Sequence, residues 1–396
     1  MNIFKTIIFK YFRDAKLKGS IKFLHKNKQE VVFGDDFTQS VVVNVLDDRF
    51  YRRIVLNGDI GLGEAYFLKY FETDDLVSLF EWFILNKEEL PGFNSKEKKF
   101  KLFEWSNAVL RIYHKLNKNT KKGSKKNIKY HYDVSNDFYK LWLDKTMTYS
   151  SAVFEGSMNL EEAQKNKYRK ICEKLDLQTK DHVLEIGSGW GGFSMYAASH
   201  YGCKITTVTI SEEQYSYAKE KIESAGLSDK IEILLKDYRD LDGKYDKLVS
   251  IEMMEALGHE YLGKFIGKCN EVLKSGAHAV LQFITYPDQD FDEYLKNNNY
   301  IKKYIFPGGE LISFGRFKKL IEKSESFYIK SKESIGNDYA KTLEIWANNF
   351  CKKRKEIFSL GFDEKFFLMW LYYFKYCEAG FATGYLDDLQ VKILKK

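Results

Sequence analysis

The feature that most constrains the fold is the stretch VLEIGSGWGGF, residues 183–193, where an apolar run and an acid lead into a glycine-rich loop. Gly187, Gly189 and Gly192 satisfy the spacing G-x-G-x-x-G behind an expected strand. Glycines allow a tight turn and a close approach of the backbone to a ligand, and the N-terminus of the following helix favours negative charge. The stretch therefore predicts a cofactor loop at the carboxyl end of a strand, and by itself it leaves the cofactor open.

The chain around this loop alternates between β-branched runs and helical patterns. Helices are expected at residues 160–175 and 211–225. Residues 286–345 break the alternation and are expected to form a cap insertion over the sheet, and residues 377–396 are expected to form a closing hairpin. The alternation predicts an α/β fold with a doubly wound, mostly parallel sheet. Its strands are expected at residues 183–186, 204–210, 231–235, 247–251 and 279–284.

Residues 1–113 are expected to form a separate, small α+β domain. Strand-like runs occupy residues 31–33 and 40–45, a glycine-punctuated turn region follows at residues 57–67, and a helix is expected at residues 73–86.

A lysine-dense segment separates this small domain from the rest of the chain. Residues 114–129 contain few apolar side chains and are expected to be a linker, which leaves residues 130–396 as a second, larger domain. A solvated tether is one interpretation of the segment. The other is a polybasic patch at an anionic membrane surface, where each lysine contributes ~1 kcal/mol.

Composition narrows the classes of partner. The formal net charge of +7 suits nucleic acid, anionic lipid or an anionic cofactor. No apolar run reaches the ~20 residues needed to span a bilayer, so membrane contact is expected from one side only. Residues 3–12 form either a basic amphipathic membrane segment or an ordinary packed helix. The five cysteines are scattered without CxxC pairing, which indicates a reducing compartment and neither a disulfide framework nor a metal site.

The identity of the cofactor is tested by the second strand. A dinucleotide fold places an acid about 20 residues after the loop, and this chain has threonines in TTVTISEEQ instead. The order hydrophobic-x-acid-x-Gly-x-Gly is similar to the first motif of class I methyltransferases that use S-adenosylmethionine, which implies a Rossmann-like, seven-stranded sheet. That resemblance implies that Glu185, Gly187 and Gly189 lie at the amino-acid and ribose end of the cofactor. It also implies that Asp237 and Tyr238 contact the adenine.

Longer stretches resemble one family, the cyclopropane-fatty-acyl-phospholipid synthases. They are residues 57–67, 130–156, 208–214, 303–309 and 337–346. The resemblance implies methyl transfer to the cis double bond of unsaturated acyl chains in membrane phospholipids, followed by loss of a proton from the carbocation and closure of a cyclopropane ring. It also implies a cytoplasmic enzyme that contacts the inner face of an anionic membrane, and it suggests a homodimer.

In that family the base is a bound bicarbonate ion. The resemblance implies that Glu255 lies near the developing cation, and that Tyr339 and the backbone of Ile284 contribute to the anion site. Ser151 and Gln282 stand where the best-known members have cysteine and histidine, and both can still donate hydrogen bonds.

Further positions are carried over from the same resemblance. Ala256 stands where many members have histidine. Cys377 matches a family cysteine once proposed to be catalytic, but this chemistry needs no thiol nucleophile, so a structural role is the preferred interpretation and Cys377 stays a candidate. The remaining cofactor contacts are expected at Tyr149, Ser150, Thr209, Ile210, Ser211 and Gln214.

Two alternatives remain open. The changes at Ser151 and Gln282 motivate a methyltransferase that makes methyl-branched or methylene chains, or one that acts on another small lipophilic acceptor. The small N-terminal domain and the basic linker motivate a lipid-binding module with an inactive methyltransferase domain. Nucleic acid is not expected as a partner, since neither an Asn/Asp-Pro-Pro-Tyr/Phe signature nor an RNA-binding unit is found.

Overall fold

The computed structural model describes residues 2–36, 38–90 and 135–396. The chain divides into two compact units. Among the described residues, the first unit comprises those up to residue 90 together with residues 292–307 and 350–385. The second unit comprises residues 135–291, 308–349 and 386–396.

Two later segments group with the N-terminal residues, so the first unit is not one continuous stretch of the chain. They do so because α12 (Tyr300–Tyr304) packs on α2 (Arg49–Phe67), and α16 (Glu364–Ala382) packs on α2 and α3 (Leu76–Leu85). The expected boundary at residue 113 and the expected linker at residues 114–129 lie outside the described residues.

The first unit is built on a four-stranded sheet in the order β2-β1-β3-β4. The strands are β1 (Ser20–His25), β2 (Glu30–Phe33), β3 (Ser40–Val45) and β4 (Phe71–Glu72). Phe9 and Phe12 of α1 (Ile3–Asp14) pack against Phe23 and Phe33, with ring centroids 5.0–5.8 Å apart. Residues 3–12 therefore form a packed helix.

The glycine-rich stretch 57–67 is helical, so the expected turn region is wrong. It is the second half of α2, which is kinked at Gly58 (φ 56°, ψ −129°). A Cβ at Gly61 would lie 2.0 Å from the carbonyl oxygen of Arg53, and one at Gly63 would lie 2.2 Å from the ring of Tyr300. These glycines serve close packing around the kink, a role that the local sequence does not distinguish from a turn.

Buried polar contacts and further helices complete the first unit. Glu64 accepts hydrogen bonds from Arg53 (2.7 Å), Lys303 (2.8 Å) and Tyr304 (2.7 Å).

The C-terminal stretch departs from the expected hairpin, because residues 377–382 end α16 and only residues 387–395 form a strand. The other helices here are α11 (Phe291–Lys296, mostly in this unit) and α15 (Arg354–Ser359).

The second unit contains a seven-stranded sheet in the order β10-β11-β9-β8-β5-β6-β7, which confirms the predicted fold class. The strands β9, β8, β5, β6 and β7 are parallel neighbours, and β11 runs antiparallel to both β9 and β10. Because β10 belongs to this sheet, residues 286–345 are not wholly an insertion over it. The strands are β5 (His182–Ile186), β6 (Lys204–Thr209), β7 (Ile231–Leu235), β8 (Tyr245–Ile251), β9 (Leu273–Thr285), β10 (Phe327–Ser334) and β11 (Asp387–Lys395).

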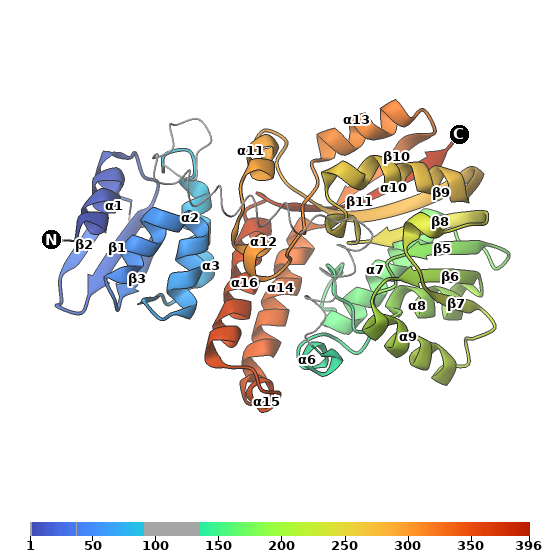
Figure 1. Cartoon of the computed structure of the whole chain (residues 1–396), viewed down its shortest axis with the longest axis horizontal. Coiled ribbons are helices and arrows are strands. Elements are labelled where there is room, and N and C mark those ends of the chain that lie inside the picture. The colour runs from blue at the N-terminus through green and yellow to red at the C-terminus, as the bar shows by residue number, and fades with distance from the viewer. Residues whose placement is uncertain (1, 37, 91–134) are drawn as a thin grey trace. The chain divides into compact units, whose positions relative to one another are not determined.

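Helices cover both faces of this sheet (Figure 1). The alternation of side chains along β5 explains the two cores, since Val183 packs with α7 and α8 while Leu184 and Ile186 pack toward α10 and α13. The helices of this unit include α6 (Asn136–Lys140), α7 (Leu160–Leu175), α8 (Gly192–Tyr201), α9 (Glu212–Ser224), α10 (His259–Val272), α13 (Phe314–Ser324) and α14 (Gly336–Lys352, whose last residues belong to the first unit). Short 3-10 turns follow β7 (η1, Tyr238–Asp240) and β8 (η2, Met254–Ala256).

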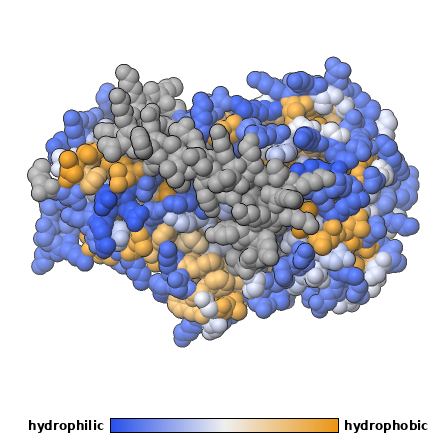
Figure 2. All heavy atoms as spheres, in the orientation of Figure 1, coloured by the Kyte–Doolittle hydropathy of each residue, from blue (hydrophilic) through white to orange (hydrophobic). Residues whose placement is uncertain are grey.

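The surface is mostly hydrophilic in the view of Figure 2, with separate hydrophobic patches. One patch at the lower edge of that view lies where Figure 1 places α15, and Phe358 and Leu360 are exposed there. Across the described residues, no helix is both long enough and apolar enough to cross a membrane.

Candidate functional site

The carboxyl ends of four strands meet around the glycine-rich loop. The backbone amides of Gly187 and Ser188 both donate to the carbonyl of Val208 (3.0 Å each), which ties the end of β5 to the end of β6. Ser250 Oγ on β8 donates to the carbonyl of Ile186 (2.9 Å). The amide of Glu252, after β8, donates to the carbonyl of Gln282 on β9 (2.8 Å). This edge of a parallel sheet is where α/β folds bind their ligands.

The loop itself leaves room for a ligand. Gly187 (φ 96°) lies against Met253, since a Cβ there would come within 2.9 Å of its side chain. A Cβ at Gly189 (φ 49°) would meet no atom within 4 Å. The backbone at Gly189 is therefore open to close approach by a cofactor, as the resemblance implies, and the nearby Met253 links the loop to the segment after β8.

Glu185 is buried and holds the loop together from the inside. One of its carboxylate oxygens accepts hydrogen bonds from Ser194 on α8 and from Thr207 on β6 (2.6 Å for Thr207). Burial raises the pKa of Glu185 to about 7. Its contacts are those of a residue that joins β5, β6 and α8, and its expected role beside the cofactor stays a prediction.

The predicted contacts after β6 form one hydrogen-bonded turn. Thr209 Oγ1 donates to Gln214 Oε1 (2.9 Å), and the amide of Ser211 donates to Thr209 Oγ1 (3.1 Å). Ser211 Oγ in turn accepts from the amide of Gln214 (3.3 Å) and caps α9. Ile210 lies between these residues and is half-buried.

Asp237 and Tyr238 lie directly after β7, as expected, but both have partners within the protein. The carboxylate of Asp237 accepts from the Arg239 side chain at 2.8 and 2.7 Å. The ring of Tyr238 packs against Phe265 with centroids 5.5 Å apart. Contact with adenine stays a prediction, and Arg239 is an additional residue at this position that the sequence analysis missed.

Tyr149 and Ser150 belong to two different environments. The ring of Tyr149 lies in an aromatic cluster with Tyr139, Trp142 and Trp346, at centroid distances of 5.3–5.6 Å. Ser150 Oγ accepts a hydrogen bond from Lys167, whose side chain is fully buried. Burial lowers the pKa of Lys167 to about 8, against the opposing charge of Glu252. The sequence analysis did not identify this lysine.

Three of the residues expected to hold bicarbonate, Ser151, Gln282 and Tyr339, donate hydrogen bonds to one carboxylate of the protein, that of Glu252. Glu252 Oε1 accepts from the backbone amide of Ser151 and from Gln282 Nε2, both at 2.8 Å. Glu252 Oε2 accepts from the hydroxyl of Tyr339 at 2.7 Å. The hydroxyl of Ser151 points elsewhere, since it donates to the carbonyl of Ala152 (2.9 Å).

Glu255 and Ile284 form the other half of this cluster. Glu255 Oε1 accepts from the backbone amide of Ile284 at 2.6 Å, and its Oε2 atom is buried without a hydrogen-bond partner among the described residues. Burial, followed by the negative charge of Glu252, raises the pKa of Glu255 to about 8. An unpartnered carboxyl oxygen of this kind is placed to meet a positive charge on a ligand.

These donors do not fit a bicarbonate ion. Ser151, Gln282 and Tyr339 already donate to Glu252, and Ile284 already donates to Glu255. The arrangement satisfies the donors with carboxylates of the chain, so no anion is needed to complete it.

Cys377 lies on α16, in the first unit, whereas the residues around Glu252 belong to the second unit. Burial raises the pKa of its thiol to about 12, which disfavours the nucleophilic thiolate.

Comparison with known proteins finds similarity to cyclopropane synthases and related lipid methyltransferases. The family model of mycolic acid cyclopropane synthetase matches residues 119–391. The tuberculostearic acid methyltransferase UfaA1 of Mycobacterium tuberculosis is 33% identical over 358 residues, which cover 88% of this chain and 82% of that protein. The cyclopropane-fatty-acyl-phospholipid synthase of Escherichia coli is 34% identical over 352 residues, which cover 88% of this chain and 86% of that protein.

Solved structures of methyltransferases have a similar fold. The mycolic acid cyclopropane synthase CmaA1 complexed with SAH and CTAB matches with a TM-score of 0.64 and 30% identity, and the match covers 68% of this chain and 98% of that chain. Coclaurine N-methyltransferase, at 19% identity and a TM-score of 0.64, shares the fold.

Proposed function

The chain belongs to the mycolic acid cyclopropane synthetase family of S-adenosylmethionine-dependent lipid methyltransferases, and we propose that it methylates the cis double bond of unsaturated acyl chains in membrane phospholipids to form a cyclopropane ring. The single observation that carries the proposal is Glu255. Its Oε2 atom is buried without a hydrogen-bond partner among the described residues, and Glu255 follows two residues after Met253, which lies against Gly187 of the cofactor loop. A carboxyl group in that place suits a reaction that develops positive charge on an apolar substrate.

Different residues of the chain have different roles in the proposed reaction. S-adenosylmethionine supplies an electrophilic methyl group. The open backbone at Gly189 admits it, and the aromatic cluster around Tyr149 excludes water, which an alkene nucleophile requires. Glu255 stabilises the cation that forms on the acyl chain, and the amide of Ile284 fixes the orientation of its carboxyl group.

The first unit supplies support for contact with a membrane. Phe358 and Leu360 are exposed at the end of α15, and Lys352, Lys353 and Lys355 are exposed next to them. Apolar side chains beside basic ones suit the boundary of an anionic bilayer. This surface supports the proposal that the enzyme contacts an anionic membrane, while its location at the cytoplasmic face and a homodimer stay predictions.

The test uses purified protein, S-adenosylmethionine and vesicles of unsaturated phospholipid. The acyl chains should gain the mass of one CH₂ group, and proton NMR of the product lipid should show cyclopropane ring protons. Unchanged acyl chains, in a preparation shown to bind the cofactor, would contradict the proposal.

A second candidate is a methyltransferase that forms methyl-branched or methylene chains. The observation that favours it is the similarity to UfaA1, which covers as much of this chain as the similarity to the cyclopropane synthase. The same NMR spectrum separates the two candidates, because a methyl-branched or methylene product has no ring protons.

A further inference from the structure

The carboxylate of Glu252 occupies the centre of the donor set on which the family resemblance places an anion. It receives three hydrogen bonds of 2.7–2.8 Å, from Ser151, Gln282 and Tyr339. These donors come from three parts of the chain, namely the loop before α7, strand β9 and helix α14. Three donors stabilise the negatively charged form of a carboxylate.

The backbone at Glu252 supports a functional role for the side chain. Its φ of 47° lies in the left-handed region, which side chains other than glycine adopt at a cost of about 1 kcal/mol or more. Glycine would adopt this conformation without that cost. The side chain is half-buried, so it lies at the rim of the buried cluster and not inside it.

A second acid, Asp388, accepts a hydrogen bond from the same amide group as Glu252. Asp388 on β11 is fully buried and shares the donor Gln282 Nε2, at 2.9 Å from its Oδ2. Burial and the negative charge of Glu252 raise the pKa of Asp388 well above its ordinary value. This shift favours the protonated form of Asp388, whose proton can then be donated to Glu252.

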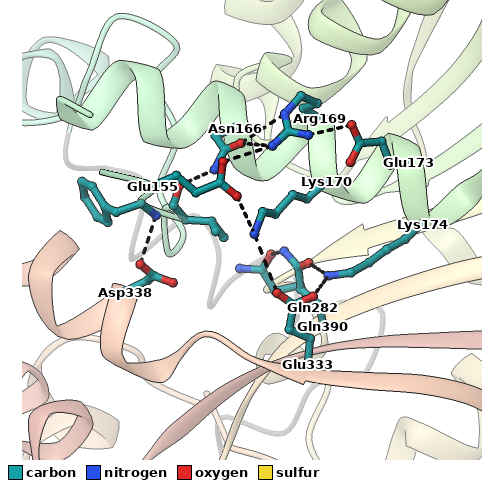
Figure 3. Close-up of polar contacts among 12 residues, drawn as sticks. Glu155, Asn166, Arg169, Lys170, Glu173, Lys174, Gln282, Glu333, Asp338 and Gln390 are labelled. Carbon is teal, nitrogen blue, oxygen red and sulfur yellow. Dashed lines mark hydrogen bonds and ion pairs between the residues drawn. The ribbon is translucent and has the colours of Figure 1, made fainter. Parts of the chain in front are cut away.

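The orientation of the shared amide is set by a chain of contacts that begins at a lysine (Figure 3). Lys174 can only donate, so the atom of Gln390 that faces it is Oε1. The Nε2 atom of Gln390 then donates to Gln282 Oε1 at 3.0 Å. This leaves Gln282 Nε2 as the atom that faces Glu252 and Asp388.

We propose that Glu252 is the base of the reaction, that it replaces the bicarbonate ion, and that Lys174, Gln390 and Asp388 are positioning residues that hold its carboxylate in place. This inference rests on the proposed function. Its geometric basis is the occupation of all three donors by Glu252 and the fixed amide of Gln282.

The step balances without a further reactant. In the methylated cation, one C–H bond of the new methyl group breaks, and its electron pair forms the C–C bond that closes the ring. The proton bonds to a carboxylate oxygen of Glu252, which becomes neutral. Glu252 returns the proton to water when the product leaves, since its side chain is not enclosed.

The first experiment measures ring formation in buffer free of carbon dioxide and with added bicarbonate. The wild-type rate should be the same in both. Glu252→Gln keeps the size of the side chain but removes the base, so its rate should fall by ~10²–10³. Glu271→Gln on the exposed face of α10 is the matched control and should keep the wild-type rate. A wild-type rate that rises and saturates with bicarbonate, or a Glu252→Gln variant at the wild-type rate, would overturn the proposal.

Glu252→Gly provides a second, positive test. Glycine suits the local backbone, and its small size frees the three donors. This variant should be slow in bicarbonate-free buffer and should gain rate as bicarbonate is added.

The positioning chain is tested with two lysines one helical turn apart. Both Lys174 and Lys170 pair with Glu333, but only Lys174 contacts Gln390. Lys174→Met should lower kcat about tenfold with little change in KM for the cofactor, and Lys174→Arg should restore most of it. The deuterium isotope effect measured with methyl-deuterated S-adenosylmethionine should also increase in Lys174→Met, because proton removal becomes slower. Lys170→Met should change none of these, and equal effects of the two methionine variants would contradict the positioning role.

Failure of this inference is distinguishable from failure of the proposed function. Wild-type enzyme that forms rings only with bicarbonate refutes Glu252 as the base and leaves the function intact. Wild-type enzyme that adds no CH₂ group under any condition refutes the function itself.

Discussion

At the scale of single residues, Glu255 is expected to act in catalysis and not in cofactor binding. Its carboxyl contacts the amide of Ile284 and no other hydrogen-bond partner among the described residues. Glu255→Gln should therefore bind S-adenosylmethionine as the wild type does, while ring formation falls by ~10²–10³, since the carboxyl group that can ionise beside the cation is lost. Calorimetric titration and the vesicle assay measure the two effects. Unchanged turnover would show that Glu255 lies outside the reacting pocket.

The same residue predicts a pH dependence of stability. The pKa of Glu255 is raised to about 8, so between the ordinary value and pH 8 the folded protein keeps a proton that the unfolded chain loses. Folding stability from this group therefore falls as pH rises through that interval. The melting temperature of Glu255→Gln relative to wild type should rise from about pH 5 to about pH 8 and then level off. A difference that is constant with pH would mean that Glu255 titrates normally.

Residue positions were only partly predictable from the sequence. Motif matching identified Ser151, Gln282 and Tyr339, but it did not identify Glu252, on which their hydrogen bonds converge. The signal was present as a second glutamate three residues before Glu255. Nothing local marked it, because the direction of a side chain beyond a strand end depends on the strands beside it.

At the scale of elements, the loop between β5 and α8 gives a test with a matched control. Gly189 and Gly226 both have positive φ, and a Cβ at either would meet no atom within 4 Å. Alanine at either position should lower the free energy of unfolding by about 1 kcal/mol. Only Gly189→Ala should also weaken binding of S-adenosylmethionine, by about tenfold or more, because its Cβ enters the space left for the cofactor.

Thermal unfolding and calorimetric titration of both variants check this prediction. Equal cofactor affinity in the two variants would contradict the prediction that the cofactor binds next to Gly189.

Elements with strong local signals were predicted well. The helix at residues 160–175 has the predicted bounds, because Asn159 and Glu162 form a capping box at its start. The glycine-rich half of α2 was expected to be a turn region and the C-terminal part of α16 to belong to a hairpin, and both are helical. Their helical state depends on packing against other segments of the first unit, which local propensity does not contain.

At the scale of the whole molecule, the exposed side chains at the end of α15 predict how the protein meets its substrate. The double variant Phe358→Ser and Leu360→Ser should bind anionic phospholipid vesicles at least ~10-fold more weakly, since burial of each side chain contributes about 1.5–3 kcal/mol. Val32→Ser in β2, which removes another exposed apolar side chain of the same unit, is the control. Cosedimentation with vesicles measures both, and equal losses would place the membrane contact elsewhere.

The sequence by itself determined the class of fold and the family, because an alternating pattern, a glycine-rich loop and long ordered motifs are local properties of the chain. Only the tertiary structure decided what fills the anion site. Ser151, Glu252, Gln282 and Tyr339 are separated by up to 188 positions and meet through strand register and the docking of α14. The direction of each donor there is set by its partner, from Lys174 through two amides to a carboxylate, and such a network exists only once the sheet is assembled.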